Sequence, residues 1–332
     1  MTTGSAMQTD AEFLGITDAD AGRSRFTVIE RLARLDGRLY GGSAIAISIA
    51  EAERVTERPA LWVTTQFVST VETGEQVDVI TEVLAAGRRT CQIRVTAKSQ
   101  SGEVIFASLG ATGIHRPDGL TGVFEKCPTV TPPEEADLWR SPFSGLAKAV
   151  GLDHLKVPLR KAGFSLAVEM REPAVLLHPE PGPGRICLWV RRADRVAVTP
   201  AIAAFLADMV PMSVGYALGV VAGGTSLDNS IRIGSFVDTE WILLDLRPHL
   251  AAGGYAHGVV HVWSEDGHLL ATASQTASMI LFDPDGSCLG RAIDGRPKVL
   301  TSHALVQGRV HARFEVDRRH GRRWHRRAAP AS

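Results

Sequence analysis

Two short segments of the chain are apolar at nearly every position, and each ends in a carboxylate. Residues 44–51 read Ala-Ile-Ala-Ile-Ser-Ile-Ala-Glu, and residues 201–208 read Ala-Ile-Ala-Ala-Phe-Leu-Ala-Asp. A helix on a protein surface carries one apolar stripe, whereas a helix that is apolar on all sides is enclosed by other elements. The pattern therefore predicts two buried helices, and their match position by position indicates an internal duplication.

Apolar and polar residues alternate in several stretches after each predicted helix, which is typical of half-buried strands. Tight turns at Ser101-Gly102 and Asp266-Gly267 join the last two strands of each set into a long hairpin. The predicted strands are residues 61–71, 76–86, 89–100 and 103–115 in the first half, and 226–236, 239–248, 254–264 and 268–281 in the second. The two halves thus repeat the same order of elements.

The duplication divides the 332 residues into two modules, in keeping with a chain too long for one typical core. A proline-rich connector separates them, with a short helix predicted at 143–152. We expect a flexible N-terminus at 1–14, an N-terminal module at 15–115, the connector at 116–165, a C-terminal module at 166–283, and an extension with a basic tail at 284–332.

Composition removes several classes of function. Lys+Arg and Asp+Glu number 36 each, so no overall field draws nucleic acid or a membrane to the chain. The four cysteines lack metal-ligand spacing, which argues against a disulfide framework or a zinc site. The first residues lack a signal-peptide pattern, and polar residues interrupt the apolar run 201–221. We expect a cytoplasmic protein with no metal and no cofactor.

Several short motifs, in matching order over roughly residues 15–283, resemble the acyl-CoA thioesterase II family. They are Tyr40-Gly41-Gly42, Leu188-Trp189-Val190-Arg191, Ala207-Asp208, the segment 226–230, and Ala273-Ser274-Gln275. The resemblance implies an α+β fold, the double hotdog, in which two antiparallel sheets each wrap a central apolar helix. It also implies an enzyme that hydrolyses acyl-CoA, with a medium- to long-chain acyl group expected, to a free fatty acid and CoA.

In that family a helix Asp, a strand Ser or Thr and a Gln on the last strand orient the hydrolytic water. The resemblance places these roles on Asp208, Ser226 and Gln275. The chain departs from the family at Asn229, where His is common, and at Ser43, where Gln is frequent. These departures bear on rate and acyl preference more than on the fold.

The residues themselves favour a site around Asp208. It is the single charged residue between Val198 and Val214, so its carboxylate is expected on an apolar helix face, where burial raises its pKa unless hydrogen-bond donors restrain it. Pro211 cannot donate to the carbonyl of Ala207, so the helix is expected to bend or end just beyond Asp208. A structural carboxylate satisfied by one partner is the alternative.

The first half matches Asp208 with Glu51 but places Gly110 where the second half has Gln275, which predicts a degenerate site around Glu51. Electrophile activation is expected from the first half instead. The backbone N–H groups of Gly41 and Gly42 start its helix and suit an oxyanion hole, although two glycines in a tight turn explain them equally well.

Strand alternation places Asp228 on the same face as Ser226, so Asp228 is expected behind the site as a supporting acid. Absence of the GxSxG motif argues against a serine hydrolase of the α/β type. Two alternatives stay open: a hotdog hydratase, which needs an Asp/His pair, and a non-catalytic acyl-CoA-binding protein. The expected partner is the acyl-CoA substrate, with a second copy of the chain in a homodimer or larger homo-oligomer.

Overall fold

The computed structural model describes residues 9–139, 163–220 and 222–281, which belong to the compact unit Met1–Lys298. Its first half begins with α1 (Asp10–Phe13), η1 (Glu30–Leu32) and the long helix α2 (Gly41–Thr56). Its strands are β1 (Ile16–Asp20), β2 (Arg23–Thr27), β3 (Ala60–Phe67), β4 (Gln76–Ala86), β5 (Thr90–Ser99) and β6 (Val104–Gly113).

The second half repeats this plan, but its helix is divided. The helices are α4 (Pro200–Ala207) and α5 (Val210–Leu218), and a 3-10 turn, η2 (Gly163–Leu166), precedes them. Its strands are β9 (Val168–Glu172), β11 (Ile186–Arg192), β12 (Ala222–Ile233), β13 (Ile242–Ala252), β14 (Tyr255–Ser264) and β15 (Leu269–Leu281). The segment Pro200–Leu218 has the length and hydropathy of a membrane span, but 78% of it is buried inside the protein.

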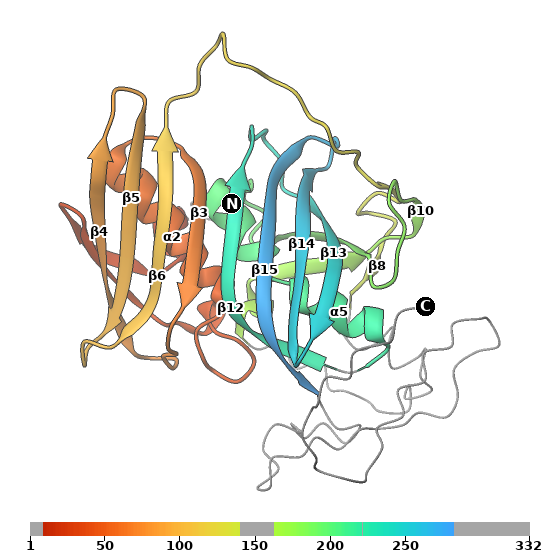
Figure 1. The fold of residues 1–332 in the computed structure, drawn as a ribbon, viewed down its shortest axis with the longest axis horizontal. Coiled ribbons are helices and arrows are strands. Elements are labelled where there is room, and N and C mark those ends of the chain that lie inside the picture. The colour runs from red at the N-terminus through yellow and green to blue at the C-terminus, as the bar shows by residue number, and fades with distance from the viewer. Residues whose placement is uncertain (1–8, 140–162, 221, 282–332) are drawn as a thin grey trace, which may run out of the picture. The chain divides into compact units, whose positions relative to one another are not determined.

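The double hotdog fold is confirmed, with one difference in how its sheets are joined. β3 pairs with β12, so the two predicted sheets continue into one 13-stranded antiparallel sheet. In Figure 1, β3 to β6 form the first half of this sheet with α2 against them, and β12 to β15 lie in the second half. Thr64 lies opposite Ser230 at this junction, and their hydroxyl oxygens are 2.7 Å apart. The hydroxyl pair therefore links the two halves across the sheet.

The start of the chain is more ordered than the predicted flexible N-terminus. Thr9 caps α1 in a capping box with Glu12, and Phe13 and Leu14 are buried. The ring of Phe13 meets Phe205 of α4 edge to face, with centroids 5.3 Å apart. Residues 9–14 therefore pack against the second-half helix, while residues 1–8 lie outside the described ranges.

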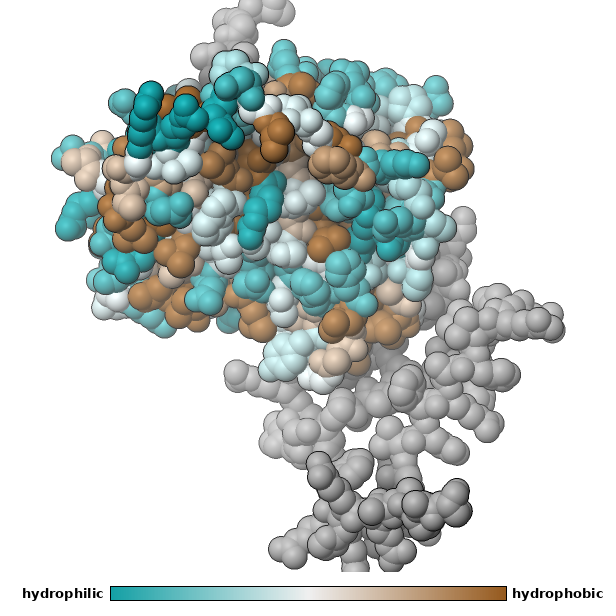
Figure 2. All heavy atoms as spheres, turned by 45° about the horizontal axis from the view of Figure 1, so that its top comes forward, coloured by the Kyte–Doolittle hydropathy of each residue, from teal (hydrophilic) through white to brown (hydrophobic). Residues whose placement is uncertain are grey.

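The connector covers the outer face of the second half of the sheet. It contributes the short strands β7 (Thr129–Val130) and β8 (Asp137–Leu138), and β7 pairs with β10 (Val175–Leu177) of the C-terminal module. A separate apolar cluster lies beneath it, built on three tryptophans: Trp189, Trp241 and Trp263. The predicted helix at 143–152, the basic tail and Cys288 fall outside the described residues. On the face drawn in Figure 2, hydrophilic and hydrophobic side chains are interspersed.

Candidate active site

Asp208 lies where the second-half helix is interrupted. α4 ends at Ala207 and α5 begins at Val210, so Asp208 takes a non-helical conformation between them. Pro211 is in the first turn of α5, a position that proline tolerates because no N–H donor is needed there. The helix is thus interrupted at Asp208, close to the position that Pro211 predicted, and the carboxylate reaches residues of β12 and β15.

Two amide side chains hold the Asp208 carboxylate. Asn229 donates through Nδ2 to Asp208 Oδ1 at 2.8 Å, and Gln275 donates through Nε2 to the same oxygen at 2.6 Å. Gln275 Nε2 also lies 2.6 Å from Ser226 Oγ. Its Oε1 accepts from the Val210 N–H at 3.1 Å, which fixes the direction of the amide. The structure thus brings Asp208, Ser226 and Gln275 together.

A β-bulge in β12 decides which of its residues face the site. Ser226 pairs with Ala277 and Asp228 with Thr276, so Leu227 has no partner on β15. The extra residue reverses the alternation, and Ser226 and Asn229, three positions apart, both reach Gln275 or Asp208. The expected position of Asp228 is therefore wrong: its carboxylate accepts from the Thr276 N–H at 3.1 Å instead of supporting the site.

Burial makes Asp208 easier to protonate than an ordinary carboxyl group. Its side chain is nearly inaccessible to water, and desolvation raises its pKa to about 6. The Asn229 amide, a backbone N–H from Gly42 and the charge of Arg34 each limit this rise by stabilising the anion. A carboxyl group with a pKa near neutrality is suited to accept a proton from water.

The N-terminus of α2 faces Asp208 from the first half. Gly42 hydrogen-bonds the Asp208 carboxylate through its backbone, and a Cβ at Gly41 would collide with Asp208 Oδ2. Tyr40, the N-cap residue, donates its hydroxyl to the backbone oxygen of Asp208 at 3.1 Å. Burial and the Asp208 charge keep the pKa of Tyr40 well above its usual value, so the phenol stays protonated.

The corresponding position in the first half carries no comparable site. Glu51 is buried and forms two hydrogen bonds with Arg54, one turn along α2, at 3.0 and 2.8 Å. Gly110 has no side chain, and a Cβ there would lie 2.7 Å from the carbonyl oxygen of Trp62. Close packing has therefore closed the space that Gln275 occupies in the second half.

Sequence reasoning missed Asn229 as a direct partner of Asp208. Simple alternation from Ser226 points Asn229 to the opposite face, and the bulge that corrects this leaves no clear mark in the sequence. The departure from the family at this position was the one available signal. Asn229 is 1% exposed and belongs to the centre of the site.

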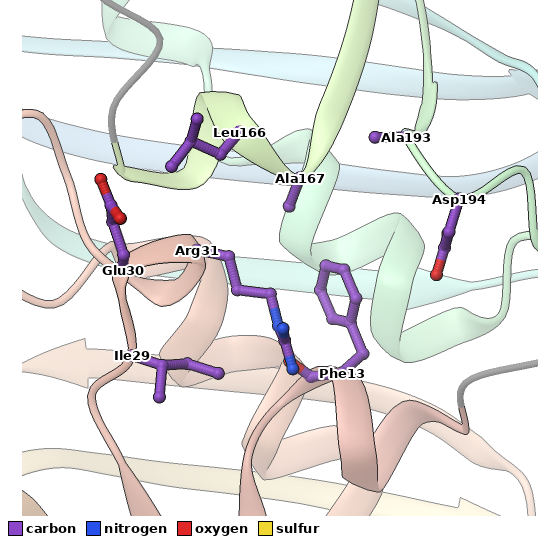
Figure 3. A pocket seen from close by; sticks show the side chains of 8 residues that line it. All are labelled: Phe13, Ile29, Glu30, Arg31, Leu166, Ala167, Ala193 and Asp194. Carbon is purple, nitrogen blue, oxygen red and sulfur yellow. The ribbon is translucent and has the colours of Figure 1, made fainter.

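Two other features lie apart from these residues. A groove of about 520 Å³ is lined by Phe13 and Arg31 from the first half and by Leu166 and Asp194 from the second, among others (Figure 3). None of Asp208, Ser226 and Gln275 lines it. Edge-to-face contacts from Phe13 to Phe205 and from Phe205 to Tyr40 fill the space between this groove and Asp208.

The second feature is a group of potential metal ligands beneath the connector. The ligand atoms of His178, Cys187 and Asp245 lie within 4.8 Å of one another. Asp245 already accepts from Arg247 at 2.8 Å and contacts His178 at 2.9 Å, so its charge is compensated without a metal ion. A cation here would lie against the Arg247 guanidinium, which opposes its binding.

The fold and the site define a hydrolase of the hotdog class, and family comparisons identify its family. The family model of the acyl-CoA thioesterase N-terminal domain matches residues 30–113, and the model of the C-terminal domain matches residues 126–279. The two models together match more than half of the chain, so it belongs to the acyl-CoA thioesterase family and is a thioester hydrolase. Among curated proteins, none matches the chain.

Solved structures match both halves together. A candidate thioesterase from Novosphingobium aromaticivorans is 29% identical, with a TM-score of 0.67 over 80% of this chain and 98% of that one. An acyl-CoA thioesterase II from Mycobacterium marinum is 20% identical, with a TM-score of 0.62 over 82% and 98%. A hot dog protein from Alicyclobacillus acidocaldarius is 20% identical, with a TM-score of 0.66 over 81% and 97%. The latter two likenesses bear on the fold alone.

Proposed function

We propose that this thioesterase hydrolyses medium- to long-chain acyl-CoA, with Asp208 as the general base for the attacking water and Ser226 and Gln275 as its positioning groups. The observation that carries the proposal is the Asp208 carboxylate, buried and held by two amides at the N-terminus of α2. A buried ionisable group in such a setting is typical of a catalytic acid or base.

In the proposed reaction, Asp208 accepts one proton from water as the water oxygen attacks the thioester carbonyl carbon. The carbonyl electron pair moves to oxygen and then returns as the C–S bond breaks. The leaving thiolate of CoA takes up the proton that Asp208 received, so the products are a fatty acid and free CoA. The reaction needs no metal ion and no cofactor.

Charge that develops on the carbonyl oxygen requires donors close to Asp208. The N-terminus of α2 supports this role because no side chain caps it, and its first N–H groups point out of the helix toward the site. Glycine at positions 41 and 42 allows the substrate carbonyl to approach the backbone closely. The Gly41 N–H is therefore the proposed oxyanion donor, whereas the Gly42 N–H, the second candidate, already donates to the Asp208 carboxylate.

The alternatives predict different groups around the carboxylate. A hydratase needs a histidine as the partner of the acid, whereas the side chains that hydrogen-bond Asp208 in the described ranges are the amides of Asn229 and Gln275. A binding protein without turnover has no need to keep an ionisable carboxylate in an apolar interior, where burial is unfavourable. These considerations support hydrolysis.

The remaining expectations also belong to the proposal. Phe67 borders Gly41, and an apolar surface beside the reacting carbonyl supports an apolar acyl group. The described cysteines Cys91, Cys127 and Cys187 are free thiols, in keeping with a reducing cytoplasm. A homodimer or larger homo-oligomer is expected, which size-exclusion chromatography with light scattering measures.

The test is release of free CoA, followed with a thiol-reactive dye across a series of acyl chain lengths. We expect turnover without added metal, rising from short to medium and long chains. Binding of acyl-CoA without turnover at any chain length would favour the non-catalytic alternative. Fastest turnover with a short chain would keep the reaction but overturn the substrate class.

A further inference from the structure

One polar atom in the site lacks a partner. Asn229 is buried, and its Nδ2 donates to Asp208 Oδ1 at 2.8 Å. An ionised carboxylate only accepts hydrogen bonds, so the NH₂ end of the amide must face Asp208. The other end, Asn229 Oδ1, has no hydrogen-bond partner among the described residues. A buried acceptor in this state is unfavourable, which raises the question of what donates to it.

The nearest strand neighbour cannot be that donor. Thr65 lies opposite Asn229 where β3 pairs with β12, but its hydroxyl oxygen is 2.8 Å from Ser108 Oγ. Ser108 Oγ is in turn 2.8 Å from Ser48 Oγ, and Ser48 donates to the Ala44 carbonyl oxygen.

Because a carbonyl only accepts, the direction of this chain of hydrogen bonds is fixed. Ser48 gives its single proton to Ala44, so Ser108 must donate to Ser48, and Thr65 must donate to Ser108. Every hydroxyl proton in the chain is then in use. The donor to Asn229 Oδ1 must therefore come from outside these residues.

We infer that Asn229 Oδ1 accepts one hydrogen of the attacking water while the Asp208 carboxylate accepts the other. A water molecule has two hydrogens, and the hydrogen bond between Asn229 and Asp208 keeps the two side chains adjacent, so one water in contact with both would find an acceptor for each hydrogen. Asn229 thus has two roles. Its nitrogen positions the base, and its oxygen fixes the orientation of the nucleophile. This inference rests on the proposed hydrolysis.

The inference has a consequence for which nucleophile the enzyme uses. Methanol has one O–H hydrogen, which it must give to Asp208, so it leaves Asn229 Oδ1 without a donor. Water satisfies both acceptors. The site is therefore expected to discriminate against small alcohols, so that the acyl group passes to water even when an alcohol is present.

The experiment measures how the acyl group divides between water and methanol. The parent and variants turn over one acyl-CoA in a fixed concentration of methanol, and the free acid and methyl ester are separated and quantified. Asn229→Leu keeps the approximate size of the side chain but removes both the acceptor and the donor to Asp208. Asn229→Asp keeps an acceptor oxygen at the same place but sets a second carboxyl group against Asp208, so the two groups share one proton and Asp208 becomes a weaker base.

We expect Asn229→Leu to lower kcat by at least about tenfold with little change in KM, and to raise the methyl ester share several-fold. Asn229→Asp is also expected to be slow, yet to divide the acyl group as the parent does. An equal share of ester in Asn229→Leu and the parent would overturn the inference. So would a loss confined to KM, which would indicate that Oδ1 accepts from a substrate N–H.

Two controls keep the outcomes distinct. If the parent releases no CoA from any acyl-CoA, the proposed function has failed and this inference falls with it. If the parent is active and the ester share does not respond to Asn229, only the inference fails. Asn229→Ala replaces Asn229→Leu should the leucine variant not fold by circular dichroism, since the alanine side chain also has no hydrogen-bond acceptor.

Discussion

The two halves of the molecule share one plan but differ at the starts and ends of their buried helices. α2 runs unbroken from Gly41 to Thr56 and begins without a side-chain cap. α4 begins at Pro200, which has no N–H, and Thr199 caps it by accepting from the Ile202 N–H at 3.2 Å. The start of α2 therefore directs a backbone N–H, that of Gly42, to Asp208 in the other half, whereas the start of α4 is capped by its own Thr199.

The difference at the other end is complementary. The second-half helix stops at Ala207 and leaves Asp208 facing the sheet, whereas Glu51 stays within α2 and pairs with Arg54. Each half has thus kept one component of a composite site: the first keeps the helix N-terminus and the second keeps the carboxylate. Duplication relieved each copy of the need to carry both, which accounts for a single site in a symmetrical scaffold.

Replacing Asp208 or Glu51 by its amide is expected to give the largest difference in activity between the two halves. Asp208→Asn is expected to lower kcat/KM by at least about a hundredfold, the scale of losing a general base. Glu51→Gln removes the matching charge in the first half and is expected to leave turnover close to that of the parent. Steady-state CoA release measures both, and equal losses in the two variants would refute a single site.

Removing the second-half amide tests the asymmetry between Gln275 and Gly110. Gln275→Gly copies the first half and removes a hydrogen bond to a charged group, so kcat is expected to fall by about tenfold to a hundredfold. Gly110→Gln should not create a site, because its Cβ would crowd the Trp62 carbonyl oxygen. It is expected instead to lower the melting temperature. Any gain of activity from Gly110→Gln would contradict this account.

Crowding the first-half helix start is expected to have a smaller effect. In Gly41→Ala the added methyl group meets Asp208 Oδ2, so the carboxylate must shift and turnover should fall by about tenfold or more. The backbone of Gly41 is helical, so the chain is expected to fold. Unchanged kcat with a normal circular dichroism spectrum would place the N-terminus of α2 outside the reaction.

The raised pKa of Asp208 means that ionisation of this carboxyl group lowers the free energy of unfolding. The unfolded carboxyl titrates near its usual value, and the folded one has a pKa of about 6, so the group favours folding at low pH and this contribution is lost as the pH rises through about 6. Asp208→Asn should therefore be more stable than the parent at about pH 8, by up to about 3 kcal/mol.

The advantage of Asp208→Asn should shrink toward zero as the pH falls below the ordinary carboxyl pKa of 3.8, where the parent is protonated in both states. Thermal unfolding of both proteins at a series of pH values measures it. The same ionisation predicts that kcat/KM of the parent rises with pH and levels off above about 6, since the base must be deprotonated. The other ionisable groups facing Asp208 are Tyr40 and Arg34. An advantage that does not vary with pH would contradict a buried, ionised Asp208.

Much of the fold could be predicted from the sequence because the same helix, strand and turn patterns occur in both halves. The hairpin predicted at 89–100 and 103–115 is formed by β5 and β6, with ends that differ by one or two residues. Alternation and tight turns are local properties, so one chain suffices to locate them. The interruption at Asp208 was also foreseeable, since Pro211 removes a helix donor.

What could not be predicted depends on contacts between distant segments. The bulge at Leu227 lies in the pairing of β12 with β15, next to the point where β3 begins to pair with β12, and these are contacts that no single strand reveals. The order of residues 9–14 likewise comes from Phe205, far along the chain. Strand alternation therefore put Asp228, and not Asn229, on the face of Ser226, whereas the role of Gln275 came from the family resemblance.

Because β3 and β12 belong to the same chain, assembly of the composite site does not depend on protein concentration. Hotdog modules on separate chains would lose their composite site whenever the pair dissociated. Here the pairing partner is covalently attached, and the hydroxyls of Thr64 and Ser230 fix the alignment of the two edges. The helix N-terminus and the carboxylate therefore meet at a high effective concentration set by the chain itself, so activity per molecule should stay constant however few copies a solution contains.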